Sequence, residues 1–290
     1  MKQKSILGML AILLISGTAS ACQRNMTAMA TQTDVANAQS APEQRTDKKD
    51  KVIDTREYKV GTFDRISCST IASIHFTQGS QTSVVAKLRA GSLDLLKVTN
   101  EDGCLTIVTD CNEYTGSSNT NRFSIDPKNR AYVGDLDGNH SNQQQVDIYI
   151  TAPSLRSLDM SGVCSFTAEQ LNMPKIKFNL TGVCTLKVPK LVCDDTHLDV
   201  SGVGTSEVNV TGKSLKVENS GTGTINLNFK GEEADLSNCG VGKLTAQVDC
   251  KELKAENSGV AKMTLKGTAD HTNIDSSGMS KTNTKELNNY

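Results

Sequence analysis

The stretch LDMSGVCSF, residues 158–166, is the first of seven near copies of one nine-residue pattern. The later copies are FNLTGVCTL, LDVSGVGTS, VENSGTGTI, LSNCGVGKL, AENSGVAKM and IDSSGMSKT. Each copy is centred on one glycine, and the glycines follow one another at intervals of 20, 20, 19, 19, 19 and 19 residues: Gly162, Gly182, Gly202, Gly221, Gly240, Gly259 and Gly278. A period this regular over seven copies predicts a solenoid, in which each repeat packs on its neighbours.

Apolar residues alternate with polar residues on both sides of each glycine. Four residues before the glycine, the aligned copies carry Leu158, Phe178, Leu198, Val217, Leu236, Ala255 and Ile274. A period of two predicts strands with one buried and one exposed face, and the repeat shows no helical period. Strands in successive coils would lie about 4.8 Å apart. We therefore predict an all-β fold, a single-stranded parallel β-helix of 19–20-residue coils, which the rule for strand connections makes right-handed.

Two columns of the repeat, the glycines and the asparagines near them, have a structural interpretation. The glycine is expected at a corner, where a positive φ or a close neighbouring backbone excludes other residues. Two residues before it, three consecutive coils carry Asn219, Asn238 and Asn257. Stacked in this way, the amides would form a hydrogen-bonded ladder along the axis. A polar binding stripe is the alternative for this column, and we favour the ladder.

The N-terminus has the features of an export signal. Lys2 and Lys4 precede ILGMLAILLI (6–15), an apolar segment too short to span a bilayer as a helix. Small residues then lead to Cys22, in an arrangement that resembles a bacterial lipobox without its usual leucine. We predict a signal peptide over residues 1–21 and a lipid on Cys22, with plain secretion as the alternative. Acyl chains on this cysteine would anchor the protein to a membrane.

The rest of the chain divides into a tether and a repeat domain. Residues 22–50 are polar and aperiodic, which predicts a flexible tether. The β-helical domain is expected over residues 51–290, with seven regular coils over 155–285. Residues 112–143 are polar and rich in turn-forming residues, so we interpret them as an insertion or long loop. An earlier, degenerate copy, ISCSTIASI (66–74), has a threonine where the other copies have glycine.

Four segments lead into the serial Ser-Gly coils: FDRI (63–66), FTQG (76–79), DGCLTI (102–107) and VDIYITAPSLRSLDMSG (146–162). In this order, and followed by the coils, they resemble the head GIN domain family, which is also labelled as auto-transporter adhesins. The similarity covers about residues 55–285. It implies a bacterial envelope protein with a β-helical fold, and the family has no assigned catalytic residues.

The residues that could perform chemistry are few. The chain has 31 basic and 32 acidic residues, which argues against a nucleic-acid partner because phosphate binding needs a basic face. Its four histidines lie in different columns, so we expect no metal site and no cofactor. Glu218 and Glu256 stand two coils apart, roughly 9.6 Å by the strand spacing, which is near the separation in inverting glycosidases. A solvated strand face is the interpretation that we favour for them.

The alignment of the coils suggests one disulfide between cysteines of adjacent coils. Apart from Cys22, the chain has eight cysteines, and export would place them in an oxidising compartment. Cys164 and Cys184 share a column in adjacent coils, about 4.8 Å apart, which is within the range for a disulfide. Their parallel Cβ directions make this bond awkward. Buried cysteine as a small apolar filler is the alternative that we favour.

These observations lead to one functional expectation with two alternatives. We expect a non-catalytic outer-membrane lipoprotein of the bacterial cell envelope that faces the periplasm or the cell surface. Its partners would be the membrane, through the N-terminal lipid, and a glycan or protein ligand bound by an adhesin-like or structural module. A polysaccharide-acting β-helix enzyme would need a groove lined by carboxylates and a basic residue. An envelope assembly scaffold would need an apolar outer face or an exposed end coil.

Overall fold

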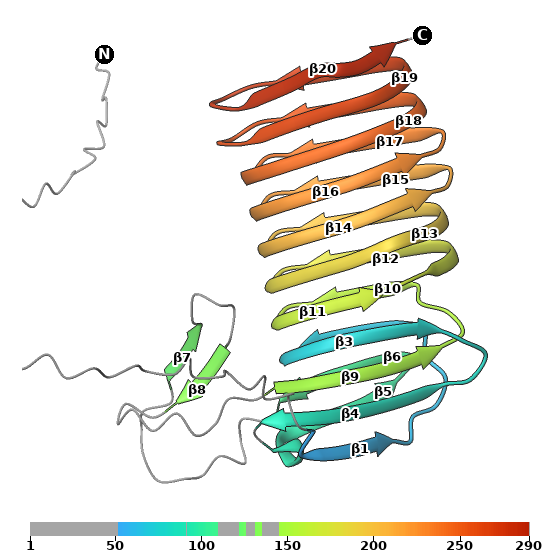
Figure 1. Cartoon of the computed structure of the whole chain (residues 1–290), viewed down its shortest axis with the longest axis vertical. Helices are drawn as coiled ribbons and strands as arrows, with labels where there is room; N and C mark the ends of the chain where they lie inside the picture. Colours follow the sequence, from blue (N-terminus) through green and yellow to red (C-terminus); the bar gives the residue numbers. More distant parts are fainter. Residues whose placement is uncertain (1–51, 91, 110–121, 126–130, 135–144, 290) are drawn as a thin grey trace, which may run out of the picture. The chain divides into compact units, whose positions relative to one another are not determined.

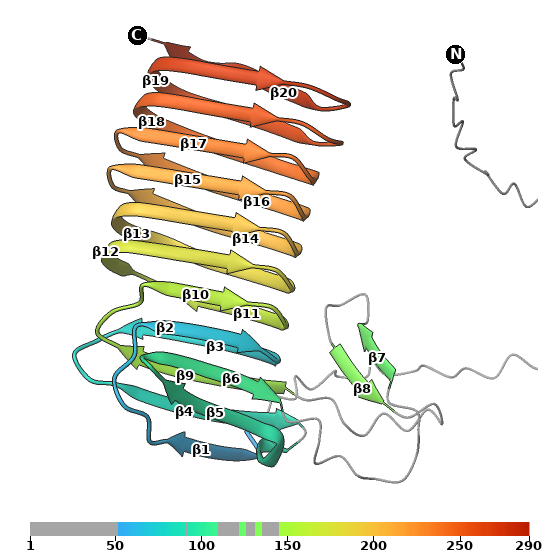
Figure 2. The same ribbon diagram turned by 180° about the vertical axis from the view of Figure 1, so that it is seen from behind.

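The computed structural model describes residues 52–90, 92–109, 122–125, 131–134 and 145–289. The predicted signal peptide, Cys22 and the tether (22–50) lie outside the described residues. The described residues fall in one compact unit, Lys48–Tyr290, in which β-strands form a stack of coils (Figures 1 and 2). The predicted all-β solenoid is therefore confirmed.

The described residues form twenty strands and one short 3-10 helix. The N-terminal elements are β1 (Asp54–Tyr58), β2 (Arg65–Ser69), β3 (Ile71–Gln78), β4 (Ser83–Ala90), η1 (Leu93–Leu95), β5 (Leu96–Glu101), β6 (Cys104–Thr109), β7 (Arg122–Ile125), β8 (Ala131–Gly134) and β9 (Gln145–Ala152). The later elements are β10 (Ser157–Met160), β11 (Val163–Ala168), β12 (Leu171–Leu180), β13 (Val183–Val200), β14 (Val203–Thr211), β15 (Ser214–Asn219), β16 (Thr222–Lys230), β17 (Glu233–Asn238), β18 (Val241–Asn257), β19 (Lys262–Ser276) and β20 (Lys281–Asn289).

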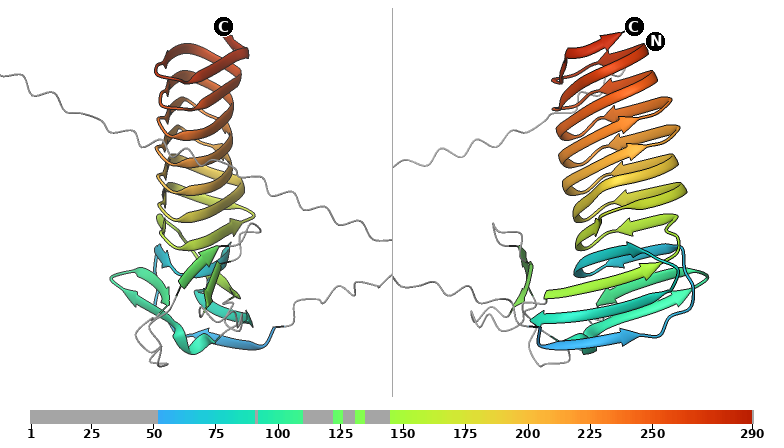
Figure 3. Two further views of the ribbon diagram at one scale, coloured as in Figure 1. Left: turned by 90° about the vertical axis from the view of Figure 1, so that its left-hand side faces the viewer. Right: turned by 45° about the vertical axis from the view of Figure 1, so that its right-hand side comes forward.

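Each regular coil has two walls. The first wall is the strand segment before the Ser-Gly pair, and the second wall is the segment after it. Both walls pair in parallel with the same wall of the next coil, one repeat along the chain. Leu198 pairs with Val217, for example, and Val217 with Leu236. Like side chains therefore lie above one another along the axis, and Figure 3 shows the same stack from two further sides.

The glycines at the Ser-Gly corner sit directly above one another. A Cβ atom on Gly202 would lie 2.0 Å from the carbonyl oxygen of Gly182, and one on Gly221 would lie 2.1 Å from that of Gly202. The same carbonyls accept inter-coil hydrogen bonds; Gly182 accepts one of 2.9 Å from the amide of Val203. Positive φ angles occur at this corner only in the last two described copies, Gly259 and Gly278. Over the other coils, the close approach of the neighbouring backbone is what requires glycine.

The space between the walls is filled by the inward-facing residues of both. Leu158, Phe178 and Leu236 are each 0% exposed, and one hydrophobic cluster runs through the stack from the N-terminal strands to Ala269. Because every coil contributes to the same core, a polar residue in one coil affects its neighbours above and below.

We expect Leu236→Asp to destabilise the stack by more than about 4 kcal/mol, because it places a carboxylate in a dry column. Lys243 is exposed on the second wall of the same repeat, so Lys243→Asp is the matched control. Urea unfolding should show a lower midpoint for the first variant and little change for the second. Equal midpoints for both variants and the parent would mean that Leu236 is not an inward residue.

The N-terminal coils follow a different order in space from their order in the chain. β2 lies between β10 and β6, and β3 lies between β11 and β9. Leu158 pairs with Ile66, and a Cβ on Gly162 would lie 2.1 Å from the carbonyl oxygen of Thr70. The degenerate copy therefore is a coil, with Thr70 at its corner. The sequence did not predict that this coil would separate β9 from β10, the strand that follows it in the chain.

Part of the predicted insertion is regular structure. Within residues 112–143, β7 and β8 pair in antiparallel fashion, and the remainder of that segment lies outside the described residues. In the chain this segment connects β6 to β9, which are the two strands of the coil next to that of β2 and β3. It therefore takes the place that a Ser-Gly corner has in the regular coils.

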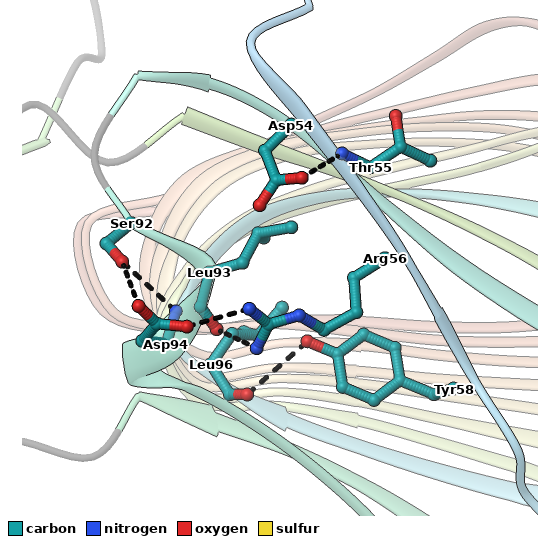
Figure 4. A network of polar contacts seen from close by, with 8 residues as sticks. All are labelled: Asp54, Thr55, Arg56, Tyr58, Ser92, Leu93, Asp94 and Leu96. Atoms are coloured by element: carbon teal, nitrogen blue, oxygen red, sulfur yellow. Dashed lines mark hydrogen bonds and ion pairs between the residues drawn. The ribbon is translucent and has the colours of Figure 1, made fainter.

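Antiparallel strands close the N-terminal end of the stack. β4 pairs with β9, and β1 pairs with β4. Arg56 on β1 donates hydrogen bonds to the carbonyl oxygen of Leu93 at 3.1 Å and to Oδ1 of Asp94 at 2.7 Å, while Tyr58 donates to Leu96 at 3.4 Å (Figure 4). The bond from Arg56 lowers the pKa of Asp94. These contacts hold the outermost strand against η1 and β5, so we assign this network to structure.

Candidate functional site

The outer face of the second wall carries two adjacent polar columns. Strand alternation turns these residues outward, and the parallel register aligns them from coil to coil. Together they line a shallow groove of about 400 Å³, which we call the amide groove. One column consists of Lys187, Glu207, Asn226 and Thr245, and the other of Pro189, Asn209, Asn228, Gln247 and Lys266.

The side chains of the amide groove are partly ordered by their own hydrogen bonds. Asn228 donates from Nδ2 to Oδ1 of Asn209 at 2.7 Å, and Asn209 donates from Nδ2 to the carbonyl oxygen of Pro189 at 3.0 Å. Thr245 Oγ1 is enclosed and has no hydrogen-bond partner among the described residues. The groove therefore presents positioned amide groups with hydrogen-bonding capacity left over.

The charges of the amide groove lie in ion pairs. The Lys187 ammonium is 3.8 Å from a carboxylate oxygen of Glu207, and the Lys266 ammonium is 2.9 Å from one of Glu286 on β20. Between these pairs, the lining is neutral. This distribution suits a neutral polar ligand better than a charged one, because a charged ligand would have to displace one member of a pair.

A second groove, of about 540 Å³, follows the Ser-Gly corners of the first coils. It is lined by the glycines Gly162, Gly182 and Gly202, by the hydroxyl residues before them and by the branched residues after them. Along the same edge, apolar side chains that follow the corner glycines are exposed: Val203 at 52%, Val241 at 54%, Val260 at 51% and Met279 at 79%. We call this row the apolar edge. It offers few polar groups that could fix the orientation of a small ligand.

The asparagines singled out in the sequence lie inside the solenoid. Asn219 donates from Nδ2 to Oδ1 of Asn238 at 2.8 Å, and Asn238 donates to Oδ1 of Asn257 at 3.1 Å. Asn257 in turn donates to the hydroxyl of Thr282 at 2.9 Å. The three amides are at most 2% exposed, so no ligand reaches them from outside. Their contacts satisfy polar groups in the core and align successive coils.

We expect Asn238→Ala to lower the free energy of unfolding by roughly 2 to 4 kcal/mol, because it removes the buried partners of Asn219 Nδ2 and Asn257 Oδ1. Asn228→Ala is the matched control: it removes the same kind of inter-coil bond from the exposed face and should change stability by less than about 0.5 kcal/mol. Chemical denaturation of both variants measures the difference. A similar loss in the two variants would contradict a special role for the buried ladder.

The cysteines of the candidate disulfide are free thiols in the structure. Cys164 and Cys184 are register partners on β11 and β13, and both are buried. The sulfur of Cys164 lies 3.2 Å from that of Cys68 on β2. Burial raises the pKa of Cys184 to about 11, which keeps its thiol protonated at neutral pH. The contact between Cys68 and Cys164 joins segments 96 residues apart and was not foreseen from the columns.

The carboxylates considered for catalysis are held in ion pairs. Glu218 lies 3.0 Å from the Lys216 ammonium and 2.8 Å from Nε2 of His197, and these two contacts lower its pKa. Glu256 lies 3.1 Å from the Lys254 ammonium. A glycosidase needs one carboxylic acid with a raised pKa as proton donor. The lowered pKa of Glu218 is opposite to that requirement.

The histidines remain dispersed in the part of the chain that the structure describes. His75 stacks on Tyr149, and its Nε2 lies 3.4 Å from Oδ1 of Asp147, whose other oxygen accepts a hydrogen bond from Arg89. His140 lies outside the described residues. Where side chains are described, no group of three or more His, Cys, Asp or Glu residues gathers closely enough to bind a metal ion. Nor does any described helix have the length and apolarity to cross a membrane.

Comparison with known proteins identifies a family and a fold. A family model described as "Putative auto-transporter adhesin, head GIN domain" matches residues 62–228 and 208–289. No curated protein matches the chain. A putative adhesin from Bacteroides fragilis NCTC 9343 has a similar structure, with a TM-score of 0.65, 22% identity, and coverage of 80% of this chain and 96% of that chain. A putative adhesin from Parabacteroides distasonis ATCC 8503 gives a TM-score of 0.52 at 15% identity, covering 79% and 96%.

Proposed function

The chain belongs to the head GIN domain family, and from this premise we propose that it is a cell-envelope lipoprotein whose solenoid acts as a non-catalytic, adhesin-like binding module. We assign ligand binding to the amide groove and the ligand class to neutral, hydroxyl-rich polymers, that is, glycans. The observation that carries the proposal is the pair of outward polar columns that repeats in successive coils.

The chemistry of the groove supports a glycan. A primary amide has both donors and an acceptor, so it can bond a sugar hydroxyl in either sense. Asn226, Asn228 and Gln247 present this group on two neighbouring coils, about 4.8 Å apart. An extended polymer lying along the solenoid axis would meet the same two columns at each coil. Repetition of weak contacts along one chain raises the total affinity without a deep pocket.

The ends of the groove support a neutral rather than an acidic glycan. Glu207 at one end and Glu286 at the other already engage the two lysines. A carboxylated or sulfated polymer would compete with these carboxylates for the lysines and would also be repelled by them. A neutral polymer would leave both ion pairs intact.

The N-terminal segment supports attachment to the outer membrane. In the proposal, Cys22 carries the lipid, and residues 22–50 separate it from the solenoid by an r.m.s. distance of about 30 Å for a flexible chain. Such a tether would let the amide groove sample ligands near the membrane, on its periplasmic or its outer side. The first of these arrangements suits a cell-wall glycan, and the second suits a host or matrix glycan.

Cys22→Ala should move the protein from the membrane fraction to the soluble fraction, because it removes the site of acylation. Fractionation of cells, followed by immunoblotting of both fractions, measures the shift. Cys239→Ala, which removes an exposed cysteine from the solenoid, is the control and should leave the protein in the membrane fraction. Equal membrane association of both variants and the parent would refute lipidation of Cys22.

The binding proposal is tested with the solenoid, residues 51–290, on an array of neutral and acidic glycans. We expect a neutral glycan to bind, and the double variant Asn226→Ala, Gln247→Ala to lose roughly tenfold or more in affinity through the lost hydrogen bonds. Asn273→Ala, at an exposed position on the first wall, is the control and should bind like the parent. Unchanged binding by the double variant would move the site away from the amide groove.

Two other results would replace the proposal with its alternatives. Release of shortened glycan products would indicate a polysaccharide-acting enzyme. The scaffold alternative has one observation in its favour, the apolar edge with Val203, Val241 and Val260 exposed. If the protein binds no glycan and forms oligomers that dissociate when these valines are changed to serine, as read by light scattering, the solenoid is a scaffold.

A further inference from the structure

Three buried thiols gather beside the Ser-Gly corner where the N-terminal coil meets the first regular coil. Cys68 is 0% exposed, Cys164 4% and Cys184 3%. The sulfur atoms of Cys68 and Cys164 are 3.2 Å apart. This distance is much longer than a covalent bond of about 2.05 Å, but rotation of the two side chains could close the gap of roughly 1 Å.

The two thiols of the close pair approach from different walls. Cys68 is on the first wall, in register with Met160, and Cys164 is on the second wall, in register with Ala72. Both side chains point into the narrow space behind the corner, so they converge. Cys164 and Cys184 instead belong to the same column of one wall, where neighbouring Cβ atoms point in parallel directions. Convergence is the arrangement that a disulfide needs.

We infer that Cys68 and Cys164 form a disulfide when the chain folds in an oxidising compartment, in place of the pairing of Cys164 with Cys184 that the columns suggested. The inference rests on the export that the proposed function includes, since cytosolic thiols stay reduced. Cys184 then remains a free, buried thiol.

The chemistry requires an oxidant with a disulfide bond, such as a thiol–disulfide oxidoreductase or oxidised glutathione. While the coils are still open, one cysteine thiolate attacks the oxidant, forms a mixed disulfide and releases the first oxidant thiol. The second cysteine thiolate then attacks the sulfur of the first and releases the second oxidant thiol. The two cysteines lose two protons and two electrons, and both protons and electrons end on the two released thiols.

The bond would stabilise a junction between two coils that are neighbours in space but far apart in the chain. It would join the coil of β2 and β3 to that of β10 and β11, which lie next to each other although 96 residues separate the two cysteines. The chain between them contains the antiparallel strands β4 and β5 and the segment 112–143. Closing so long a loop restricts the unfolded chain strongly, and it also fixes the coil order that differs from the chain order.

Tryptic peptides can distinguish every pairing of the three thiols. Cleavage after lysine and arginine places Cys68 in residues 66–87, Cys164 in 157–175 and Cys184 in 178–187. The solenoid, residues 51–290, is unfolded in urea and refolded in a glutathione redox buffer. After the remaining thiols are alkylated, the protein is digested without reduction, and linked peptides are identified by mass spectrometry. We expect residues 66–87 to be linked to residues 157–175 in most molecules. A link between 157–175 and 178–187, or no link among these peptides, would overturn the inference.

Variants and melting temperatures provide a second measurement. Cys184→Ser should keep the link, and its melting temperature should fall on reduction by roughly 5 to 15 °C, as for the parent. Cys68→Ser should melt at the same temperature with and without reductant. If reduction lowers the melting temperature of Cys68→Ser as much as that of the parent, another bond is responsible and the inference is wrong.

The refolding experiment does not depend on where the protein resides, so it separates this inference from the proposed function. The same peptide analysis on protein isolated from bacterial envelopes should show the same link. A link that forms on refolding but is missing from the cellular protein would refute the export premise, while the pairing of Cys68 with Cys164 would stand.

Discussion

The close stacking of corner glycines is the constraint on which the rest of the structure depends. From Gly162 to Gly240, the carbonyl oxygen at this corner accepts a hydrogen bond from the next coil. The space where a Cβ would stand is already occupied, at about 2 Å, by backbone atoms of the neighbouring coil. The coils must therefore follow one another at the spacing of paired strands. Once that spacing is fixed at one corner, the register of both walls follows, and equivalent residues fall into columns.

Burial decides what a column of side chains does. Asn219, Asn238 and Asn257 form their ladder inside, where every unpaired amide would be costly, so the column serves stability. Asn209 and Asn228 make the same kind of bond outside, at 2.7 Å, where water competes and little stability is gained. The outer amides are therefore available for a ligand. The same residue type at the same spacing thus supports the fold inside the first wall and the proposed binding outside the second wall.

The sequence predicts the regular coils well because each residue pairs with the equivalent residue of the next repeat. Leu198 pairs with Val217 and Val217 with Leu236, each 19 residues further along the chain. The sequence also identifies Thr70 as a corner residue, since its flanking columns match. The repeat period does not reveal the order of the coils in space. The antiparallel pairing of β1, β4 and β9 and the contact of Cys68 with Cys164 depend on this order, so they were not predicted. The amide groove was not predicted, although the 19-residue interval between Asn209 and Asn228 was a signal for it in the sequence.

The transition from 20-residue to 19-residue coils takes place at one irregularity, in the register between Val188 and Leu191, where the longer coil accommodates its extra residue next to Pro189. Elsewhere along the regular coils up to β19 a single inserted residue would shift inward side chains outward. Gain or loss of a whole coil, by contrast, leaves the parallel register of the remaining coils intact. Such a protein can change in length during evolution by duplication or deletion of entire turns, so that its reach and the extent of its binding face would vary in discrete steps.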